Sequence, residues 1–436
     1  MMPSSSAPTR ALLTLLAAAP LAACGDAAAG GDGDTWQAVH DTLGDTVVVR
    51  TVAGSVWGDT AQLVPELTIG EFEGADAYMF GQVQSMTVSR DGHIYLYDGH
   101  AKALRKYTPD GTYVATFGRE GGGPGEYKRP DGGLRALPDG RVVLRDPGNA
   151  RINVYSSEGE PLGSWPIRGG FSTSRQLAMD TAGRVYHQVL LDPSAGLSEW
   201  KSGLLVFSPE GEELDTLSVP DTGFEAPVIE ARTENSWSRN TVPFSPGEEW
   251  QLHPHGYFIH AISTRYALDL LRPEGVLRIA RDVEPVGVDP AEKANAEARS
   301  THNMRRMIPD WKWNGPPIPD TKPPWRSFQV GEEGRIWVVR SQPGERVPDD
   351  QIEESRDPDA APPNRWREPV VFDVYEPDGT YLGAVRAPEG FSLYPTPIFR
   401  GDRVWGIVRD ALDVQYVTRL RVDRGAAQLE RRERGE

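Results

Sequence analysis

Short runs rich in apolar residues recur along the chain, and turns rich in glycine and proline separate them. Val, Ile, Leu, Tyr and Trp dominate these runs, whose length and composition are typical of antiparallel β-strands. The chain contains 46 glycines and 37 prolines, which favours frequent turns over long helices. The pattern therefore predicts an all-β protein.

Two turn signals alternate along the chain in a shared register. The first precedes a strand and the second follows one, and glycine supplies the positive φ that such turns need. The spacing between the two is 19 residues in three copies and 28 and 45 in two others, which indicates loop insertions. The first signal is centred on Gly92, Gly140, Gly183, Gly256, Gly334 and, in a sixth copy, Asp402; the second is centred on Gly111, Gly159, Gly211, Gly275 and Gly379.

Each copy of the repeat predicts four short strands, and about six copies predict a six-bladed β-propeller of four-stranded antiparallel blades, residues 45–423. A single blade cannot bury both faces, so blades must stack on their neighbours. The last copy, residues 395–423, supplies only about three strands. We therefore expect residues 46–54 and 63–70 to complete the last blade and close the ring, which removes exposed sheet edges.

Two segments interrupt the repeat. Residues 289–328 begin with a helical stretch, in which Asp289 suits the N-cap and Pro290 the first turn, so we expect one short helical insertion. The tryptophans Trp311, Trp313 and Trp325 follow among prolines, either packed over the propeller or forming a recognition surface. Residues 341–366 are acidic and proline-rich, which predicts a loop within the fifth blade.

The single cysteine, Cys24, and the residues before it predict where the protein is located in the cell. An apolar stretch after Arg10 leads to Leu-Ala-Ala-Cys, which resembles a bacterial lipobox and implies cleavage before Cys24 and its lipidation. The alternative is an ordinary secretory signal with an accidental cysteine. We expect a signal peptide over residues 1–23, a flexible tether over 24–44 and a charged tail over 424–436, with the protein lipid-anchored in the cell envelope and facing the periplasm or exterior.

The strand and turn motifs also carry a family resemblance. "DGHIYLYD" followed by "YTPDGTYVATFG" is similar to six-bladed propellers of the NHL and TolB-like kind, and "GREGGGPGEY" resembles a class of largely uncharacterised bacterial propeller lipoproteins. The resemblance implies the fold and leaves the activity open, because propellers host unrelated functions. The formal net charge of −17 argues against nucleic-acid binding, and we expect a monomer.

The glycine-rich segment 117–132 is the first candidate site. It lacks the GxxxxGK[ST] spacing of a phosphate-binding loop and connects two strands, so it joins the first blade to the second. We expect it on the ligand-binding face, where Arg119, Glu120, Glu126 and Tyr127 are ligand-binding candidates. The alternative is a purely structural turn.

Two histidines form the second candidate site. His187 and His260 lie four residues after the first glycine, where other copies have Leu96, Leu144 and Val338. They predict either a shared polar or metal site, which needs a third ligand, or two core histidines bonded to neighbouring groups. No cofactor is predicted; calcium or zinc is the alternative. Asp98 and Asp146 recur in register, which indicates a loop-capping role.

No GxSxG, HExxH or EF-hand motif occurs in the sequence, and no catalytic residue is predicted. We therefore expect a propeller that binds a small molecule or an envelope protein and carries no catalysis of its own. The alternative is an envelope enzyme, a metal-dependent hydrolase, lactonase or lyase, with its site at the mouth of the central channel.

Overall fold

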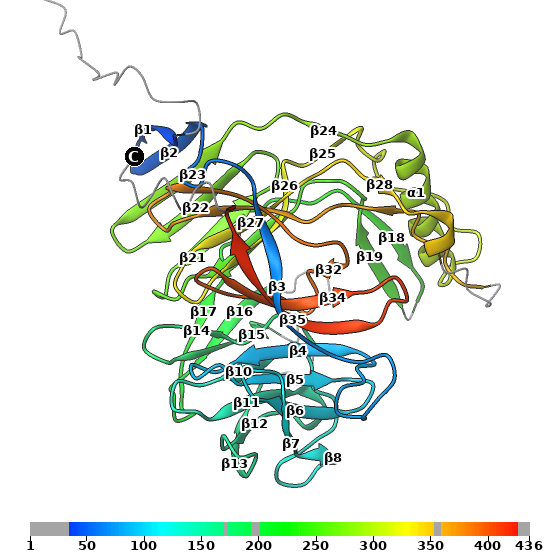
Figure 1. Cartoon of the computed structure of the whole chain (residues 1–436). Coiled ribbons are helices and arrows are strands. Elements are labelled where there is room, and N and C mark those ends of the chain that lie inside the picture. Colours follow the sequence, from blue (N-terminus) through cyan, green and yellow to red (C-terminus); the bar gives the residue numbers. More distant parts are fainter. Residues whose placement is uncertain (1–34, 169–171, 193–200, 235, 353–358, 426–436) are drawn as a thin grey trace, which may run out of the picture. The chain divides into compact units, whose positions relative to one another are not determined.

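The computed structural model of the protein describes residues 35–168, 172–192, 201–234, 236–352 and 359–425. In this part of the chain almost all regular structure is β-strand, and α1 (Pro290–Arg305) is its one α-helix (Figure 1). None of the helices in the described ranges is long and apolar enough to cross a membrane. The all-β prediction with one helical insertion is confirmed.

The first three repeat units form separate four-stranded antiparallel sheets, as predicted, with the strands side by side in chain order. The first sheet contains β4 (Val83–Val88), β5 (Ile94–Asp98), β6 (Ala103–Tyr107) and β7 (Tyr113–Phe117). The second contains β10 (Leu134–Ala136), β11 (Val142–Asp146), β12 (Arg151–Tyr155) and β13 (Pro161–Pro166). The third contains β14 (Ala178–Met179), β15 (Val185–Leu190), β16 (Ser202–Phe207) and β17 (Glu213–Ser218).

The fourth unit is widened by a hairpin from the N-terminal part of the chain. Its own strands are β20 (Glu248–Leu252), β21 (Phe258–Ile262), β22 (Ala267–Arg272) and β23 (Gly275–Arg281). β2 (Thr46–Ala53) pairs in parallel with β23, and β1 (Gln37–Leu43) pairs with β2. The prediction that residues 46–54 complete the last unit is therefore wrong. The pattern of apolar residues determines which face of a strand is buried, but it does not select the neighbouring strand. The backbone N–H and C=O groups of a strand can pair with any open sheet edge.

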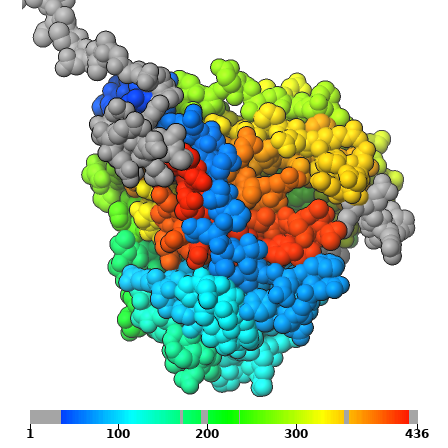
Figure 2. Space-filling model, viewed as in Figure 1, coloured from blue at the N-terminus to red at the C-terminus, as the bar shows by residue number. Residues whose placement is uncertain are grey.

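The fifth and last units share one nine-stranded sheet. The fifth contributes β26 (Trp325–Val330), β27 (Ile336–Arg340), β30 (Val371–Tyr375) and β31 (Tyr381–Arg386); the last contributes β32 (Phe391–Ser392), β33 (Ile398–Arg400), β34 (Arg403–Arg409) and β35 (Gln415–Asp423). β3 (Ala61–Ile69) lies between β31 and β35 and pairs antiparallel with β35, which confirms the pairing expected for residues 63–70. Figure 2 shows this N-terminal strand, in blue, at the surface beside the red and orange C-terminal strands.

The glycines of the repeated turns adopt the positive φ that was expected for them. In the five units that carry it, the first glycine has a φ between 80° and 95°, and its N–H bonds to the carbonyl three residues earlier, as from Gly92 to Ser89 at 3.0 Å. The second glycine has a positive φ in the same five units, for example 92° at Gly159. A Cβ at Gly159 would also lie 2.5 Å from the ring of Phe117, so both the backbone and the packing require glycine there.

Separate apolar clusters join each sheet to its neighbours. One cluster lies between each consecutive pair of sheets from the first to the last. A further cluster packs Met86 and Leu96 of the first sheet against Trp405 and Ile407 of the last unit. The first and last units are therefore also in contact, and the core is distributed among interfaces between sheets.

A buried carboxylate links the fourth and fifth sheets. Asp373 on β30 is fully buried and accepts hydrogen bonds of 2.8 Å from the hydroxyls of Tyr266 and Tyr381. The guanidinium groups of Arg281 and Arg340 each lie 3.4 Å from its Oδ1. Two hydroxyl donors and two cations thus compensate the burial of this charge.

The insertion around α1 packs against a hairpin of the chain rather than standing free. The Asp289 side chain accepts a hydrogen bond from the Ala291 N–H, as expected of an N-cap. Trp311 is 5% exposed and clusters with Met304 of α1 and with Ile229 of β18. Trp325 is buried and Trp313 partly buried, so packing accounts for these tryptophans. The short strands here are β18 (Val228–Arg232), β19 (Trp237–Thr241), β24 (Val286–Gly287), β25 (Thr321–Lys322), β28 (Glu345–Arg346) and β29 (Trp366–Arg367).

Candidate functional site

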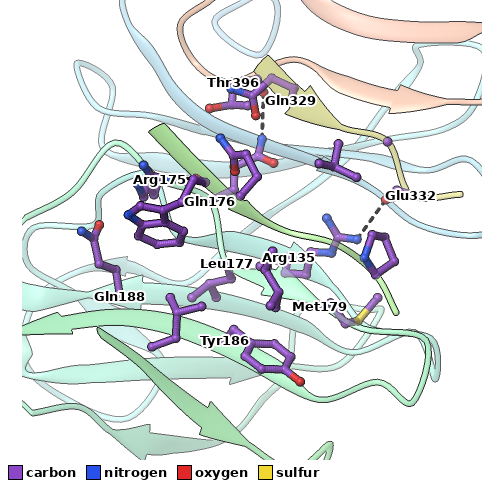
Figure 3. A pocket seen from close by; sticks show the side chains of 18 of the residues that line it. Arg135, Arg175, Gln176, Leu177, Met179, Tyr186, Gln188, Gln329, Glu332 and Thr396 are labelled. Carbon is purple, nitrogen blue, oxygen red and sulfur yellow. Dashed lines mark hydrogen bonds and ion pairs between the residues drawn. The ribbon is translucent and has the colours of Figure 1, made fainter. Parts of the chain in front are cut away.

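A cavity of ≈ 270 Å³ lies where the first strands of the third, fourth and fifth units meet (Figure 3). The chain segments that line it are residues 174–179 with β14, residues 249–252 of β20, and residues 329–332 at the end of β26. Tyr186 and Gln188 of β15, Leu204 of β16, Arg135 of β10, Pro254 and Thr396 complete the wall. Five repeat units therefore contribute residues to one site.

The repeat register explains why polar side chains enter this cavity. Arg135, Gln251 and Gln329 each lie five residues before the first glycine of their units. Because side chains alternate along a strand, residues in the same register of equivalent sheets point the same way. The cavity is thus lined by one recurring position of the first strand.

Two further cavities adjoin this one through shared lining residues. A cavity of ≈ 220 Å³ shares Arg135 and Glu332 with it, and one of ≈ 360 Å³ shares Ser174. The smaller cavity is lined by the residue two positions before the turn centre in all six units: Arg90, Pro138, Thr181, Pro254, Glu332 and Arg400. The three cavities therefore share part of their lining.

Arg175 and Trp250 form the aromatic part of the main cavity. The guanidinium carbon of Arg175 lies 4.1 Å from the centre of the Trp250 ring, and Arg175 donates a 3.1 Å hydrogen bond to the Trp250 carbonyl. Figure 3 shows Arg175 and, near it, Gln176, whose side chain donates a 2.8 Å hydrogen bond to the carbonyl of Thr396. Stacking and the backbone bond hold the guanidinium plane in place.

Glu249 lines the same cavity and is held by weak contacts. Gln251 Nε2 lies 3.4 Å from its Oε1. Burial raises the pKa of Glu249 to about 7, although the nearby charge of Arg175 and a hydrogen bond from Gln251 act in the opposite direction. Close to neutral pH this carboxyl therefore exists in both protonation states.

The other charges of the cavity are paired with one another. Glu332 lies 3.1 Å from Arg135 and 2.6 Å from Arg400, so one carboxylate serves two cations. Arg400 also donates hydrogen bonds to the carbonyls of Val88 and Ser89 in the first sheet. These contacts join four units, the first, second, fifth and last, at the end of the main cavity.

The glycine-rich segment is stabilised by its own charged side chains. Glu126 of β9 (Glu126–Tyr127) accepts hydrogen bonds from Arg119 of β8 (Arg119–Glu120) at 2.7 Å and from the Gly123 N–H at 2.8 Å. These two bonds, the backbone one first, lower the pKa of Glu126. Glu120 pairs with Lys102 at 2.6 Å.

The four candidates of this segment do not meet at the cavity. Tyr127 is 1% exposed, and its hydroxyl contacts backbone atoms of Leu104, Lys102 and Phe117, so it has a structural role. The later part of the same segment does reach the site, because residues 129–132 line the ≈ 360 Å³ cavity. Arg119, Glu120 and Glu126 are not among the residues that line the three cavities.

His187 and His260 lie in different environments. His187 is 1% exposed, its ring nitrogens have no hydrogen-bond partner among the described residues, and burial lowers its pKa to about 3. His260 lies 2.7 Å from a carboxylate oxygen of Glu248. The two histidines occupy the same register in adjacent sheets, but no hydrogen bond joins their rings, because both ring nitrogens of His187 are without a partner in the described part of the chain. Within the described ranges, no group of three His, Cys, Asp or Glu is placed to hold a metal ion.

The recurring aspartates cap loops, as predicted. Asp98 accepts hydrogen bonds from the N–H groups of Gly81 and Gln82, and Asp146 accepts them from Lys128 and Arg129. Each carboxylate thus holds the loop that enters the first strand of its own sheet. The lipidation candidate Cys24 lies outside the described residues.

Comparison with known proteins yields distant likenesses. No family model and no curated protein matches the chain. A DUF4221 family member from Bacteroides vulgatus has 11% identity and a TM-score of 0.47, covering 84% of this chain and 99% of its own. Virginiamycin B lyase from Staphylococcus aureus has 10% identity and a TM-score of 0.36, over 83% of this chain and 99% of its own. These likenesses are too distant to carry a conclusion about activity.

The residues that build the main cavity were missed from the sequence. Arg175, Glu249 and Trp250 match no motif, and the search for motifs led to histidines and glycines instead. A signal was present in the repeat, because Arg135, Gln251 and Gln329 are polar residues at one recurring position of the first strand. An alignment of the units on their turn glycines shows that polar residues recur at this position, and these three residues line the cavity.

Proposed function

We propose that the protein is a lipid-anchored, extracytoplasmic six-bladed β-propeller that binds a small polar molecule in its central channel. The observation that carries the proposal is the ≈ 270 Å³ cavity, in which Arg175 stacks on Trp250 among polar side chains supplied by one repeat position. Its volume is near the lower end of small-molecule sites, which are typically about 300–1,000 Å³. The fold positions these groups on rigid strands.

The contacts between units support the ring. An apolar cluster joins the first unit to the last, in addition to the clusters between consecutive units. The residue two positions before the turn centre in each of the six units lines one cavity, as expected when six equivalent strands surround an axis. The pairing of β3 with β35 of the last unit supports closure of the ring by the N-terminal part of the chain.

The sequence around Cys24 supports the anchor. The apolar stretch, the Leu-Ala-Ala-Cys motif and the small polar residues that follow are the parts that a lipid-anchored envelope protein requires. An anchor of this kind places the binding domain at the membrane surface on the exported side.

A ligand screen by thermal unfolding tests the binding function. The purified domain is heated with a panel of small acids, amides, amino acids and sugars, in parallel with Trp250→Ala and the control Trp313→Ala. We expect at least one compound to raise the unfolding temperature of the wild type and the Trp313→Ala control, and to have no effect on Trp250→Ala. A panel without effect, or an effect that persists in Trp250→Ala, contradicts binding in this cavity.

A second candidate function is acid–base catalysis in the same cavity. The observation that favours it is the pKa of Glu249 near 7, because a general acid or base works best when its pKa lies near the working pH. Recovery of the bound compound distinguishes the two functions. A binding protein returns it unchanged after long incubation, whereas an enzyme converts it and loses conversion in Glu249→Gln.

A further inference from the structure

Arg175 is a cation without a carboxylate partner. No carboxylate oxygen of the described residues lies within 4 Å of its guanidinium nitrogens, and its hydrogen bond goes to the neutral carbonyl of Trp250. Arginines withdrawn from water are normally paired with acids, because the desolvated charge is costly. Arg175 is partly buried and is one of the residues that line the cavity. This position is suited to an anion from outside the chain.

Glu249 is the complementary feature of the same wall. No Lys, Arg or His nitrogen of the described residues lies within 4 Å of its carboxyl oxygens, and its hydrogen bonds come from Gln251 and from the Phe328 N–H. Desolvation is the largest influence on its pKa, so the neutral acid is readily populated. A protonated carboxyl is a hydrogen-bond donor, and a ligand oxygen is its natural acceptor.

The other charged side chains of the cavity, and the polar side chains of Tyr186 and Gln188, already have partners within the chain. Arg135 and Arg400 share Glu332, and the Tyr186 hydroxyl donates a 2.8 Å hydrogen bond to Asp180. The side chain of Gln188 bonds to Thr173 and Ser202. Arg175 and Glu249 are near enough to influence each other's pKa, but they form no ion pair within 4 Å, so each is only partly compensated by the chain.

We propose that the ligand of this cavity is a small organic carboxylate, which pairs with Arg175 and accepts a hydrogen bond from protonated Glu249. This inference rests on the proposed function and specifies its ligand class. The ligand carboxylate supplies the missing counter-charge of Arg175. Where Glu249 is ionised in the free protein, it takes up one proton from solvent when the ligand binds. Binding is therefore linked to proton uptake, and affinity falls as Glu249 ionises.

Calorimetric titration tests the proposal. The probes are acetate, succinate and benzoate, each compared with its amide, and every titration is repeated in two buffers of different ionisation enthalpy at pH 7.5. We expect at least one acid to bind, its amide to bind at least tenfold more weakly, and binding to take up a fraction of one proton. Above the pKa of Glu249, affinity falls towards a limit of about tenfold per pH unit.

Two substitutions separate the roles of the two residues. Arg175→Gln is expected to weaken carboxylate binding at least tenfold, because it removes the cation and keeps a polar side chain. Glu249→Gln keeps a hydrogen-bond donor, so binding is expected to persist while proton uptake and pH dependence disappear. The control Arg386→Gln removes an exposed arginine at the end of β31 and should behave as the wild type. Thermal unfolding of each variant verifies folding.

The outcomes distinguish this inference from the broader one. Amides that bind as well as acids, an unchanged affinity in Arg175→Gln, or binding without proton uptake overturn the carboxylate assignment and leave a small-molecule cavity. If none of the six probes binds and no compound raises the unfolding temperature in the thermal screen, both the carboxylate assignment and the binding function are overturned.

Discussion

Replacement of Asp373 by alanine offers a direct test of how the fourth and fifth sheets are held together. The substitution removes the acceptor of two hydrogen bonds, from Tyr266 and Tyr381, and the counter-charge of Arg281 and Arg340. Tyr266 and Tyr381 are 4% and 3% exposed, so water does not readily replace the lost acceptor. Burial raises the pKa of both tyrosines, so their hydroxyls stay protonated and need acceptors.

The cost follows from these contacts. Each buried hydroxyl left without its acceptor costs about 1–3 kcal/mol, and Tyr266 keeps a contact of 3.2 Å with the Tyr375 hydroxyl. The arginine side chains are 24% and 27% exposed and recover part of their solvation. Because the four partners share one site, their contributions do not add fully. We expect a loss of about 4 kcal/mol in the free energy of unfolding, within the range for breaking buried charge networks.

Unfolding in guanidinium chloride measures this loss. With an m value of about 6 kcal/mol/M, a loss of about 4 kcal/mol lowers the midpoint by about 0.7 M. The control is Asp282→Ala, which removes a carboxylate that is 88% exposed and lies 3.3 Å from Arg50. Exposed pairs contribute about 0–1 kcal/mol, so the control should shift the midpoint by less than about 0.2 M. Equal shifts in the two variants would refute the reasoning.

Two further predictions concern His187 and the anchor. The pKa of His187 is about 3 in the folded protein and 6.5 in the unfolded chain, so the unfolded chain binds more protons between these values and stability falls as pH drops through this window. His187→Leu should remove roughly 2 kcal/mol of the stability lost between pH 7 and pH 5, measured as denaturation midpoints at both pH values; an unchanged pH dependence contradicts the neutral buried ring. Cys24→Ser should move the protein from the membrane fraction to the soluble fraction of exported proteins, and undiminished membrane association contradicts the anchor.

The repeat made most of the fold predictable, because it depends on local chemistry. Turn glycines need a positive φ, and Asp98 and Asp146 cap neighbouring loops, so both recur at fixed spacing. The N-cap at Asp289 follows from the same short-range logic. The partner of β2 was not predictable in this way. Its choice of the β23 edge depends on which sheet edge is near in space, and alternation in the strand carries no such information.

The candidate site was less predictable, for a related reason. A single glutamate or arginine on a strand has no unusual neighbours in sequence, and its chemistry arises when other units surround it. Glu249 acquires its raised pKa through burial by segments that include β26, about 80 residues away along the chain. The histidines stood out because they replace aliphatic residues at one repeat position, but that register does not reveal that His187 is buried without a partner among the described residues and His260 bonds to Glu248.

The pairing of β3 with β35 also has a consequence for folding during synthesis. About 350 residues separate the end of β3 at Ile69 from the start of β35 at Gln415. At about 5–20 residues per second, synthesis of that stretch takes roughly 17–70 s, during which β35 is not available to β3. The first three sheets are built from contiguous segments and need no such delay. The β3–β35 ladder therefore forms after those sheets can form, and a truncation before Gln415 removes it.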